Sequence, residues 1–170
     1  MLTPYLAGLL FGDGTSHIRY YMVWIDQHER NTYIVEKAKS ILESLNLKVY
    51  YYGFLNKKRA AVNSKELYYE FKELKNDPSK FFEYLSNDEK KEFIAGFFDA
   101  EGTVTDRLVV YNQNIELLKS IKKFFDEHGI TSYIYKFGKV YGVQIYRRKD
   151  IKIINEMIPS LKMRHSILPS

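Results

Sequence analysis

The chain of 170 residues contains no cysteine, so neither a disulfide framework nor a thiolate zinc site can form. It also lacks any apolar run close to the 18 residues that suggest a membrane-spanning helix. Its first residues, MLTP, do not show the basic region and apolar segment of a secretory signal. We therefore expect an intracellular protein, in the cytoplasm of a prokaryote or, as the alternative, in an organelle.

The chain is rich in positive charge and in aromatic side chains. Lys and Arg total 26 against 21 Asp and Glu, which gives a net charge of +5, and there are 15 Tyr and 11 Phe. A basic balance favours a polyanionic partner such as nucleic acid, although charge alone does not identify one. The length suits one compact domain or two closely packed halves.

One apolar stretch occurs twice, as YLAGLLFGDG at residues 5–14 and as FIAGFFDAEG at residues 93–102. The small residues and the terminal acids, Asp13 and Glu101, recur at an offset of 88 positions. Self-similarity at a fixed offset indicates two copies of one supersecondary unit. A single Asp-Gly after an apolar run usually marks only a helix end, but two copies in one register favour a functional site.

The small residues within each copy predict how the copies pack. Gly8 and Gly12 lie four positions apart, as do Gly96 and Ala100, which places each pair on one face of a helix. Glycine inside a helix costs about 1 kcal/mol relative to alanine. Its presence here therefore indicates close approach of another helix, as at small-residue helix contacts in membranes. We expect that partner to be the other copy.

Packing the two helices side by side would bring their C-terminal ends together, where backbone carbonyl groups are unpaired. Asp13 and Glu101 would then be neighbours, and two carboxylates beside two negative helix ends repel each other unless a cation lies between them. Hard divalent cations bind carboxylates, backbone carbonyl groups and water. The sequence therefore predicts a Mg²⁺ site formed by Asp13 and Glu101, helped by the carbonyl groups of Gly12 and Ala100.

Each copy is followed by the same predicted order of strands and helices. Residues 16–27 and 103–112 are expected to form single strands, and the basic tail beyond residue 159 is expected to be loosely held. We interpret the chain as an α+β protein with two αββαββα halves. The halves are residues 1–76 and residues 88–170, joined by a packed connection at residues 77–87.

The two repeated stretches resemble the motifs of the LAGLIDADG homing endonucleases, specifically the single-chain archaeal intron-encoded type. The nonapeptide motifs are residues 6–14 and 94–102, and the resemblance extends over nearly the whole chain. One departure is Phe11, where the family pattern has an acid that Asp99 retains in the second copy; in the family that acid is not the metal ligand. The resemblance implies pseudo-symmetric halves that form a saddle on double-stranded DNA, with the motif helices at their interface.

The resemblance also implies an activity. It is site-specific cleavage of both strands of a long, partly palindromic DNA target by Mg²⁺-dependent phosphodiester hydrolysis, with Mn²⁺ substituting and Ca²⁺ binding without supporting cleavage. Two unequal motifs in one chain imply a monomer. The alternatives are an RNA maturase that binds intron RNA and assists splicing, and a DNA-binding regulator that does not cleave. Retention of both acids argues against the regulator.

The resemblance adds further residues to the cleavage centre. Gln27 and Asn112 would orient waters near the scissile phosphates, with Gln113 as an alternative to Asn112. Lys65 and Arg148 best match the basic residues that family members often carry near each cleavage centre, although a simple phosphate contact or a surface charge explains them equally well. The usual second-half lysine has no counterpart in this sequence.

The predicted strands and hairpin tips carry basic and polar side chains in both halves. Pairs of β-strands can enter the major groove of DNA. Any one such residue is more often a solvated charge, but together they favour contacts with phosphates. The candidate DNA-contacting residues are Arg19, Trp24, Lys57, Lys58, Arg59, Arg107, Lys136, Lys139 and Gln144.

Overall fold

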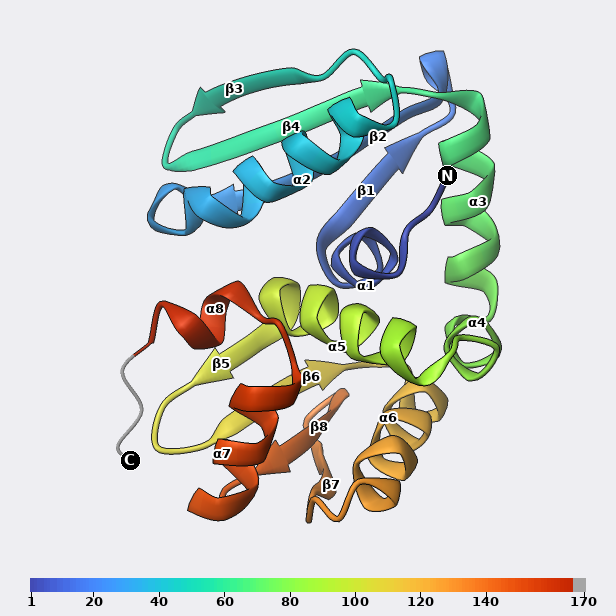
Figure 1. Cartoon of the computed structure of the whole chain (residues 1–170). Helices are drawn as coiled ribbons and strands as arrows, with labels where there is room; N and C mark the ends of the chain where they lie inside the picture. The colour runs from blue at the N-terminus through green and yellow to red at the C-terminus, as the bar shows by residue number, and fades with distance from the viewer. Residues whose placement is uncertain (167–170) are drawn as a thin grey trace.

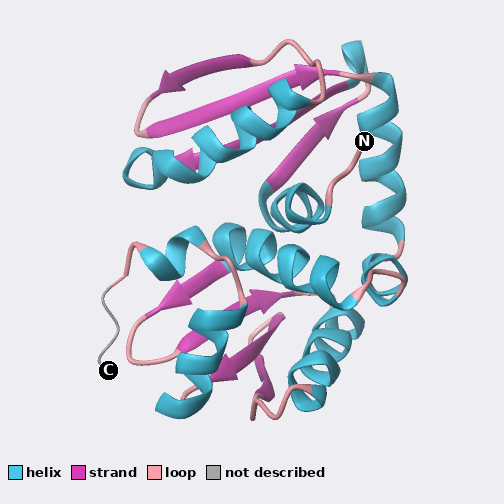
Figure 2. Ribbon diagram, viewed as in Figure 1, coloured by secondary structure: helices cyan, strands magenta, loops and turns pink. Residues whose placement is uncertain are grey.

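The computed structural model describes residues 1–166, which form two stacked halves of similar construction (Figure 1). Each half has a four-stranded antiparallel sheet packed with helices (Figure 2). The strand orders, β1-β2-β4-β3 and β5-β6-β8-β7, are equivalent. The predicted α+β class and the pseudo-symmetric pair of halves are thus confirmed.

In the first half, a helix, two strands, a second helix, two strands and a third helix follow one another. They are α1 (Pro4–Asp13), β1 (Gly14–His17), the 3₁₀ turn η1 (Arg19–Tyr21), β2 (Met22–His28), η2 (Glu29–Asn31), α2 (Thr32–Ser44), β3 (Tyr50–Phe54), β4 (Lys57–Asn63) and α3 (Lys65–Asn76). A short helix, α4 (Pro78–Glu83), lies in the connection. Its Phe82 is buried and packs edge-on against Phe93.

The second half repeats this order and adds a short terminal helix. Its elements are α5 (Asn87–Glu101), β5 (Gly102–Val104), β6 (Leu108–Asn112), α6 (Ile115–Glu127), β7 (Tyr133–Phe137), β8 (Val140–Ile145), α7 (Arg148–Met157) and α8 (Leu161–Arg164). Ser86 and Glu89 form a reciprocal capping box at the start of α5, which satisfies two backbone donors there.

The two motif helices, α1 and α5, pack against each other between the sheets (Figure 1). A Cβ atom at Gly8 would overlap the carbonyl oxygen of Phe93, and one at Gly96 would overlap the carbonyl oxygen of Tyr5. One at Gly12 would collide with the side chain of Ala100. Glycine therefore permits backbone contact between the halves, as the spacing of the small residues predicts.

The prediction of one long strand at residues 16–27 is wrong, because the chain folds back on itself there as a β1–β2 hairpin. Its turn includes Tyr20 and Tyr21, both with positive φ (62° and 49°), which non-glycine residues seldom adopt. The ring of Tyr21 packs against the rings of Tyr68 and Tyr69 at 5.6 and 5.9 Å, and these contacts help to hold the turn. Similarly, a turn at residues 105–107 divides the expected strand 103–112 into β5 and β6.

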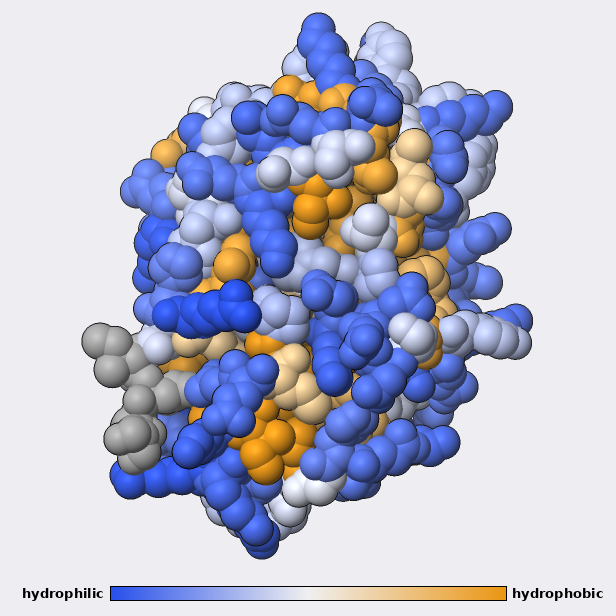
Figure 3. Space-filling view, viewed as in Figure 1, coloured by the Kyte–Doolittle hydropathy of each residue, from blue (hydrophilic) through white to orange (hydrophobic). Residues whose placement is uncertain are grey.

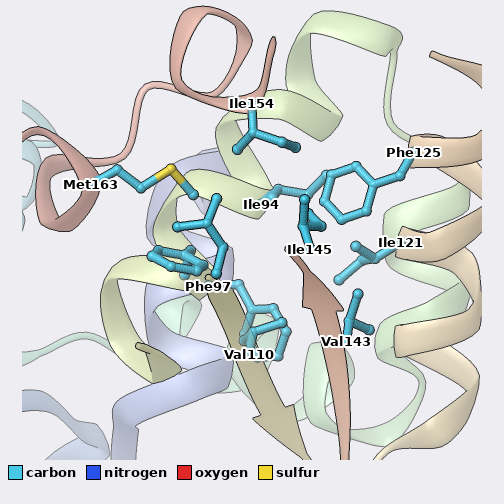
Figure 4. A pocket seen from close by; sticks show the side chains of 11 residues that line it. Ile94, Phe97, Val110, Ile121, Phe125, Val143, Ile145, Ile154 and Met163 are labelled. Carbon is cyan, nitrogen blue, oxygen red and sulfur yellow. The ribbon is translucent and has the colours of Figure 1, made fainter. Parts of the chain in front are cut away.

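The expectation of a loosely held tail is also wrong for residues 160–166. Ser160 caps α8 by accepting a hydrogen bond from the backbone N–H of Met163. The Met163 side chain is buried and lies at the edge of a small apolar cavity in the second half (Figure 4). His165 stacks on Tyr33 of α2, with ring centroids 3.8 Å apart, so this segment also contacts the first half. Residues 167–170 lie outside the described residues.

The surface in the view of Figure 3 is mostly hydrophilic, with separate apolar patches. Among residues 1–166, no helix has both the length and the apolar character to cross a bilayer. The apolar side chains instead fill a core that runs from the sheets through α1 and α5.

Candidate functional site

The two repeated acids end the two motif helices. Asp13 is the last residue of α1 and Glu101 is the last residue of α5. The contact between Gly12 and Ala100 brings these helix ends together, since a Cβ atom at Gly12 would lie 2.8 Å from Cγ of Glu101. The structure therefore pairs the carboxylates that the sequence pairs by register.

The environment of both carboxylates opposes their negative charge. Burial, followed by the charges of Glu101 and Asp26, raises the pKa of Asp13 to about 7, although the hydrogen bond from Gln27 acts in the opposite direction. Burial also raises the pKa of Glu101. Two acids that resist ionisation become more acidic when a cation binds between them.

The donor set fits a hard divalent cation held partly by a substrate. No group of three or more His, Cys, Asp or Glu side chains with metal-binding geometry occurs among residues 1–166. Two carboxylates at helix C-terminal ends match the way Mg²⁺ is usually bound, through one or two carboxylates together with water and substrate phosphates. Metal binding by Asp13 and Glu101, and the contribution of the Gly12 and Ala100 carbonyl groups, remain predictions.

The two predicted amides occupy equivalent positions but have different partners. Gln27 is buried at the end of β2, and its Nε2 donates a hydrogen bond to Oδ2 of Asp13. Asn112 ends β6, where its Oδ1 accepts a hydrogen bond from the backbone N–H of Asn114 at 2.8 Å. Gln27 therefore belongs to the acidic centre directly, whereas Asn112 supports the turn into α6. Gln113 is exposed.

A lysine from α8 completes the charged centre. Nζ of Lys162 donates a hydrogen bond to the carbonyl oxygen of Gly102, the residue that follows Glu101, at 2.9 Å. Burial lowers the pKa of Lys162, while the nearby charges of Asp99, Asp13 and Glu101 act to raise it. A cation thus faces both acids from the C-terminal segment.

Asp99 holds this segment in place. It is fully buried and accepts hydrogen bonds from the hydroxyl groups of Tyr5 and Ser160, both at 2.6 Å. It also accepts from the backbone N–H groups of Leu161 and Lys162, at 3.1 and 2.9 Å. One carboxylate therefore joins α1, α5 and α8, and it places Lys162 beside the end of α5.

Phe11 stands at the first-half position that corresponds to Asp99, and its ring packs against Phe97 at 5.8 Å. The second-half acid has a structural partner, α8, whereas the first-half position faces an apolar contact. The acid therefore has hydrogen-bond donors around it in the second half, whereas Phe11 has an aromatic neighbour in the first half.

The sheets present a second face with a polar and aromatic character. Along β2, Val23 and Ile25 are buried while Trp24 and Asp26 are partly exposed on the opposite face. Strands β4 and β8 place Arg59 and Gln144 on the corresponding outer faces, because their alternate neighbours are in the core.

The other candidate DNA-contacting residues divide between exposed connections and strand ends. Arg19 lies in η1, Arg107 in the turn between β5 and β6, and Lys139 in the turn between β7 and β8. Lys57 begins β4 and is exposed. Lys58 and Lys136 lie within strands and on a different face of their sheets.

In β4, Lys58 pairs with the buried Gln27; in β7, Lys136 pairs with Tyr141, which itself pairs with Asn112. Paired side chains share a face, so Lys58 lies beside Gln27, and Lys136 lies on the same face as Asn112 but two strands away from it. Neither lysine is on the outer face.

Comparisons with known proteins identify the fold. The sequence profile of the LAGLIDADG-like domain matches residues 88–159. Structures of I-DmoI, described as a homing endonuclease, are similar to almost the whole chain. One, in complex with DNA and Mn, has 26% identity and a TM-score of 0.72, covering 92% of this chain and 96% of that chain. The chain has the two-domain LAGLIDADG fold.

Two further structures bear on this fold. I-DmoI in complex with DNA and Ca has 26% identity and a TM-score of 0.72, covering 93% of this chain and 89% of that one. The N-terminal LAGLIDADG domain of DUF199/WhiA has 16% identity and a TM-score of 0.70, covering 96% and 84%, and shows the fold alone. No curated protein sequence matches significantly.

The register of β2 and β4 places Lys65 away from Asp13 and Glu101. Gln27 pairs with Lys58 and Met22 pairs with Asn63, so the start of α3 lies at the other end of β4. Five strand positions correspond to about 17 Å. The structure therefore does not bring Lys65 to the centre, as the family resemblance implied, and leaves the alternatives of a phosphate contact or a surface charge.

Arg148 has the equivalent position in the second half. It begins α7 just after Ile145, which pairs with Leu108, whereas Asn112 pairs with Tyr141 at the opposite end of β6. Lys65 and Arg148 begin equivalent helices in the two halves, but strand register separates both from the acidic centre formed by Asp13 and Glu101.

Lys162 is the site residue that the sequence interpretation missed. Its signal was indirect: a serine followed by a short basic segment, and an acid retained in only one of two repeats. Neither feature identifies the other as its partner without the fold.

Proposed function

We propose that the protein is a metal-dependent DNA endonuclease that recognises a specific, long and partly palindromic site and cuts both strands. The observation that carries this proposal is the pairing of Asp13 and Glu101 at two converging helix ends between two similar sheets. Similarity to I-DmoI structures that contain DNA with Mn or Ca supports it.

The sheets and the centre would divide the work. The outer faces of the two sheets would contact the grooves and the phosphates on either side, because strand pairs fit the major groove. The centre would then lie over the DNA between the two half-sites. Phosphate contacts fix the register, and base contacts supply the sequence preference.

At the centre, Asp13 and Glu101 would hold Mg²⁺, for which we expect Mn²⁺ to substitute, while Ca²⁺ would bind without supporting cleavage. A divalent cation lowers the pKa of an attacking water and stabilises the leaving oxygen of a phosphodiester. Gln27 keeps the Asp13 carboxylate oriented through its hydrogen bond. Lys162 offsets part of the negative charge before a phosphate arrives, and it is placed to attract that phosphate.

Two alternatives share this scaffold. A maturase would bind intron RNA, and a regulator would bind DNA without cutting it. The paired acids favour cleavage, since burying two carboxylates together is unfavourable and serves no evident role in a protein that only binds.

The test incubates the protein with a randomised pool of DNA duplexes in Mg²⁺, with Ca²⁺ and EDTA as parallel conditions, and sequences the duplexes that are cleaved. A defined set of sequences cut on both strands in Mg²⁺ but not in Ca²⁺ supports the proposal. Binding of duplex DNA without cutting under any metal condition would favour the regulator, and preferential binding of structured RNA would favour the maturase. Light scattering of the protein on the selected duplex should show one chain per site.

A further inference from the structure

An arginine on the outer face of the first sheet is clamped by a carboxylate. Nε of Arg59 donates a hydrogen bond to Oδ1 of Asp26 at 2.6 Å, and Nη2 donates to Oδ2 at 2.8 Å. The two residues face each other across β4 and β2, near the centre of the sheet. The bidentate pair occupies one edge of the guanidinium and fixes its plane.

Three aromatic rings hold the same guanidinium from the sides. Its Cζ lies 5.0 Å from the ring centre of Trp24, 5.9 Å from that of Tyr52 and 4.7 Å from that of Phe54. The Tyr52 hydroxyl accepts a hydrogen bond from Nη1 at 3.3 Å. The Arg59 side chain is only 22% exposed, so much of its rotamer freedom is already lost before any ligand binds.

The clamp leaves part of the guanidinium available. A guanidinium has five N–H donors. The carboxylate of Asp26 takes one on Nε and one on Nη2, and the Tyr52 hydroxyl takes one on Nη1, so one donor remains on each terminal nitrogen. One N–H on each terminal nitrogen is the number of donors needed for the O6 and N7 acceptors that guanine presents in the major groove.

A carboxylate on this face is otherwise difficult to explain. Asp26 would repel phosphates, and a face used only for phosphate contacts would favour a free arginine. A bidentate partner makes sense where the direction of the arginine matters more than its charge, as it does in reading a base edge.

The second half lacks the equivalent arrangement. The position that matches Arg59 is Gly142, which pairs with Tyr111 on one side and Tyr135 on the other. The hydroxyl groups of these tyrosines lie 3.3 Å apart. An arginine clamp in only one half would produce a base preference in only one half-site.

We propose that Asp26, Arg59 and the rings of Trp24, Tyr52 and Phe54 form a guanine-reading unit that binds O6 and N7 of one guanine in the major groove. This inference rests on the proposed DNA recognition and adds a base and a half-site to it. The guanine lies in the half-site bound by the first half, and the symmetry-related position of the other half-site has no such requirement.

The experiment is selection of bound duplexes from a randomised pool in EDTA, where nothing is cut, followed by sequencing. The wild-type protein is compared with Arg59→Gln and Asp26→Asn. Arg107→Gln is the matched control, because Nε and Nη2 of Arg107 bond both oxygens of Asp106 at 3.1 and 3.3 Å, in an exposed turn. Thermal melting shows whether each variant folds.

The wild type should select one guanine that Arg59→Gln no longer selects, with discrimination at that position falling about tenfold or more. Asp26→Asn should weaken the same preference, since its amide holds the arginine poorly. Arg107→Gln should leave the preference for this guanine unchanged.

Retention of every base preference by Arg59→Gln, or a uniform loss of affinity at all positions, would overturn the guanine-reading unit while DNA recognition stands. If Arg59→Gln does not fold, Asp26→Asn decides, because it retains the arginine; an unchanged preference then overturns the proposed clamp. If the wild type selects no sequence, the proposed site-specific recognition fails, and the unit fails with it.

Discussion

Lys162 donates a hydrogen bond to the carbonyl oxygen of Gly102 across 60 residues of sequence, at 2.9 Å. Gly102 directly follows Glu101, so this contact brings a cation to the end of α5. The backbone N–H of Lys162 is held separately by Asp99. Both the backbone N–H and the side-chain Nζ of Lys162 are therefore held by groups at the C-terminal end of α5.

Substitution Lys162→Met should affect the metal and the substrate in opposite directions. Removing a cation beside Asp13 and Glu101 should tighten binding of Ca²⁺ to the free protein, by about tenfold or roughly 1.4 kcal/mol. Cleavage in Mg²⁺ should become slower, because a phosphate then meets two acids with less compensation. Calorimetric titration with Ca²⁺ and a cleavage assay measure the two effects.

Lys162→Arg is the control, since it retains the charge and should preserve metal affinity close to wild type. Melting curves should show that α8 remains docked in both variants, because Met163 and Ser160 still anchor it. Unchanged Ca²⁺ affinity in Lys162→Met would show that this lysine is only a structural support.

Asp13→Asn and Glu101→Gln should each abolish double-strand cleavage in Mg²⁺ while DNA affinity stays within about tenfold. The acids lie at the helix ends, whereas the side chains placed to contact bases lie on the outer faces of the sheets. Loss of a negative charge also removes repulsion of phosphates. Strand-resolved cleavage and a binding titration at one fixed salt concentration are the measurements, since salt strongly changes affinity for DNA. Full cutting by either variant would eliminate the paired-acid centre.

The metal-free protein should lose stability as the pH rises from about 4 to about 7. Asp13 has its pKa raised to about 7 in the folded chain, chiefly by burial and then by the charge of Glu101, while an unfolded aspartate titrates near 3.9. Between these values the folded state holds a proton that the unfolded state has released, so the free energy of unfolding falls with increasing pH.

Asp13→Asn removes this titration. In EDTA it should exceed the wild type in stability at pH 8 by about 1–2 kcal/mol, after allowance for solvent screening, and the difference should vanish near pH 4. Urea unfolding at both pH values checks the sign. A variant that is less stable than the wild type at pH 8 would show that the carboxylate is not strained in the metal-free fold.

The features predicted correctly from the sequence are those fixed by local spacing. Gly8 and Gly96 predict the helix contact because glycine is unfavourable inside a helix unless another backbone approaches closely. The same register then pairs Asp13 with Glu101. A repeat also predicts equal strand orders, because two copies of one unit fold in the same way.

The features that sequence reasoning missed depend on tertiary contacts. The β1–β2 turn contains Tyr20 and Tyr21 with positive φ and no glycine or asparagine to signal it. Helix α8 forms where Asp99, more than 60 residues away, accepts its N-terminal backbone donors. The prediction for Lys65 fails because the order of residues along the chain places it after β4 but does not give the direction in which β4 runs past Gln27.

Gly8→Ala tests the contact on which the whole arrangement depends. The added Cβ would overlap the carbonyl oxygen of Phe93, which is backbone and cannot move aside without separating α1 from α5. Overpacking of this kind costs about 1–3 kcal/mol, which corresponds to a fall in Tm of about 2–12 °C for a chain of this size. Gly53→Ala is the matched control, because its Cβ would meet its nearest neighbour, the carbonyl oxygen of Lys57, at an ordinary 3.5 Å. Because separation of the helices also separates Asp13 from Glu101, Gly8→Ala should lose cleavage at temperatures well below its Tm, and Gly53→Ala should not. Calorimetry and a cleavage assay on the two variants decide the matter: equal Tm values would mean that the motif helices do not meet at Gly8.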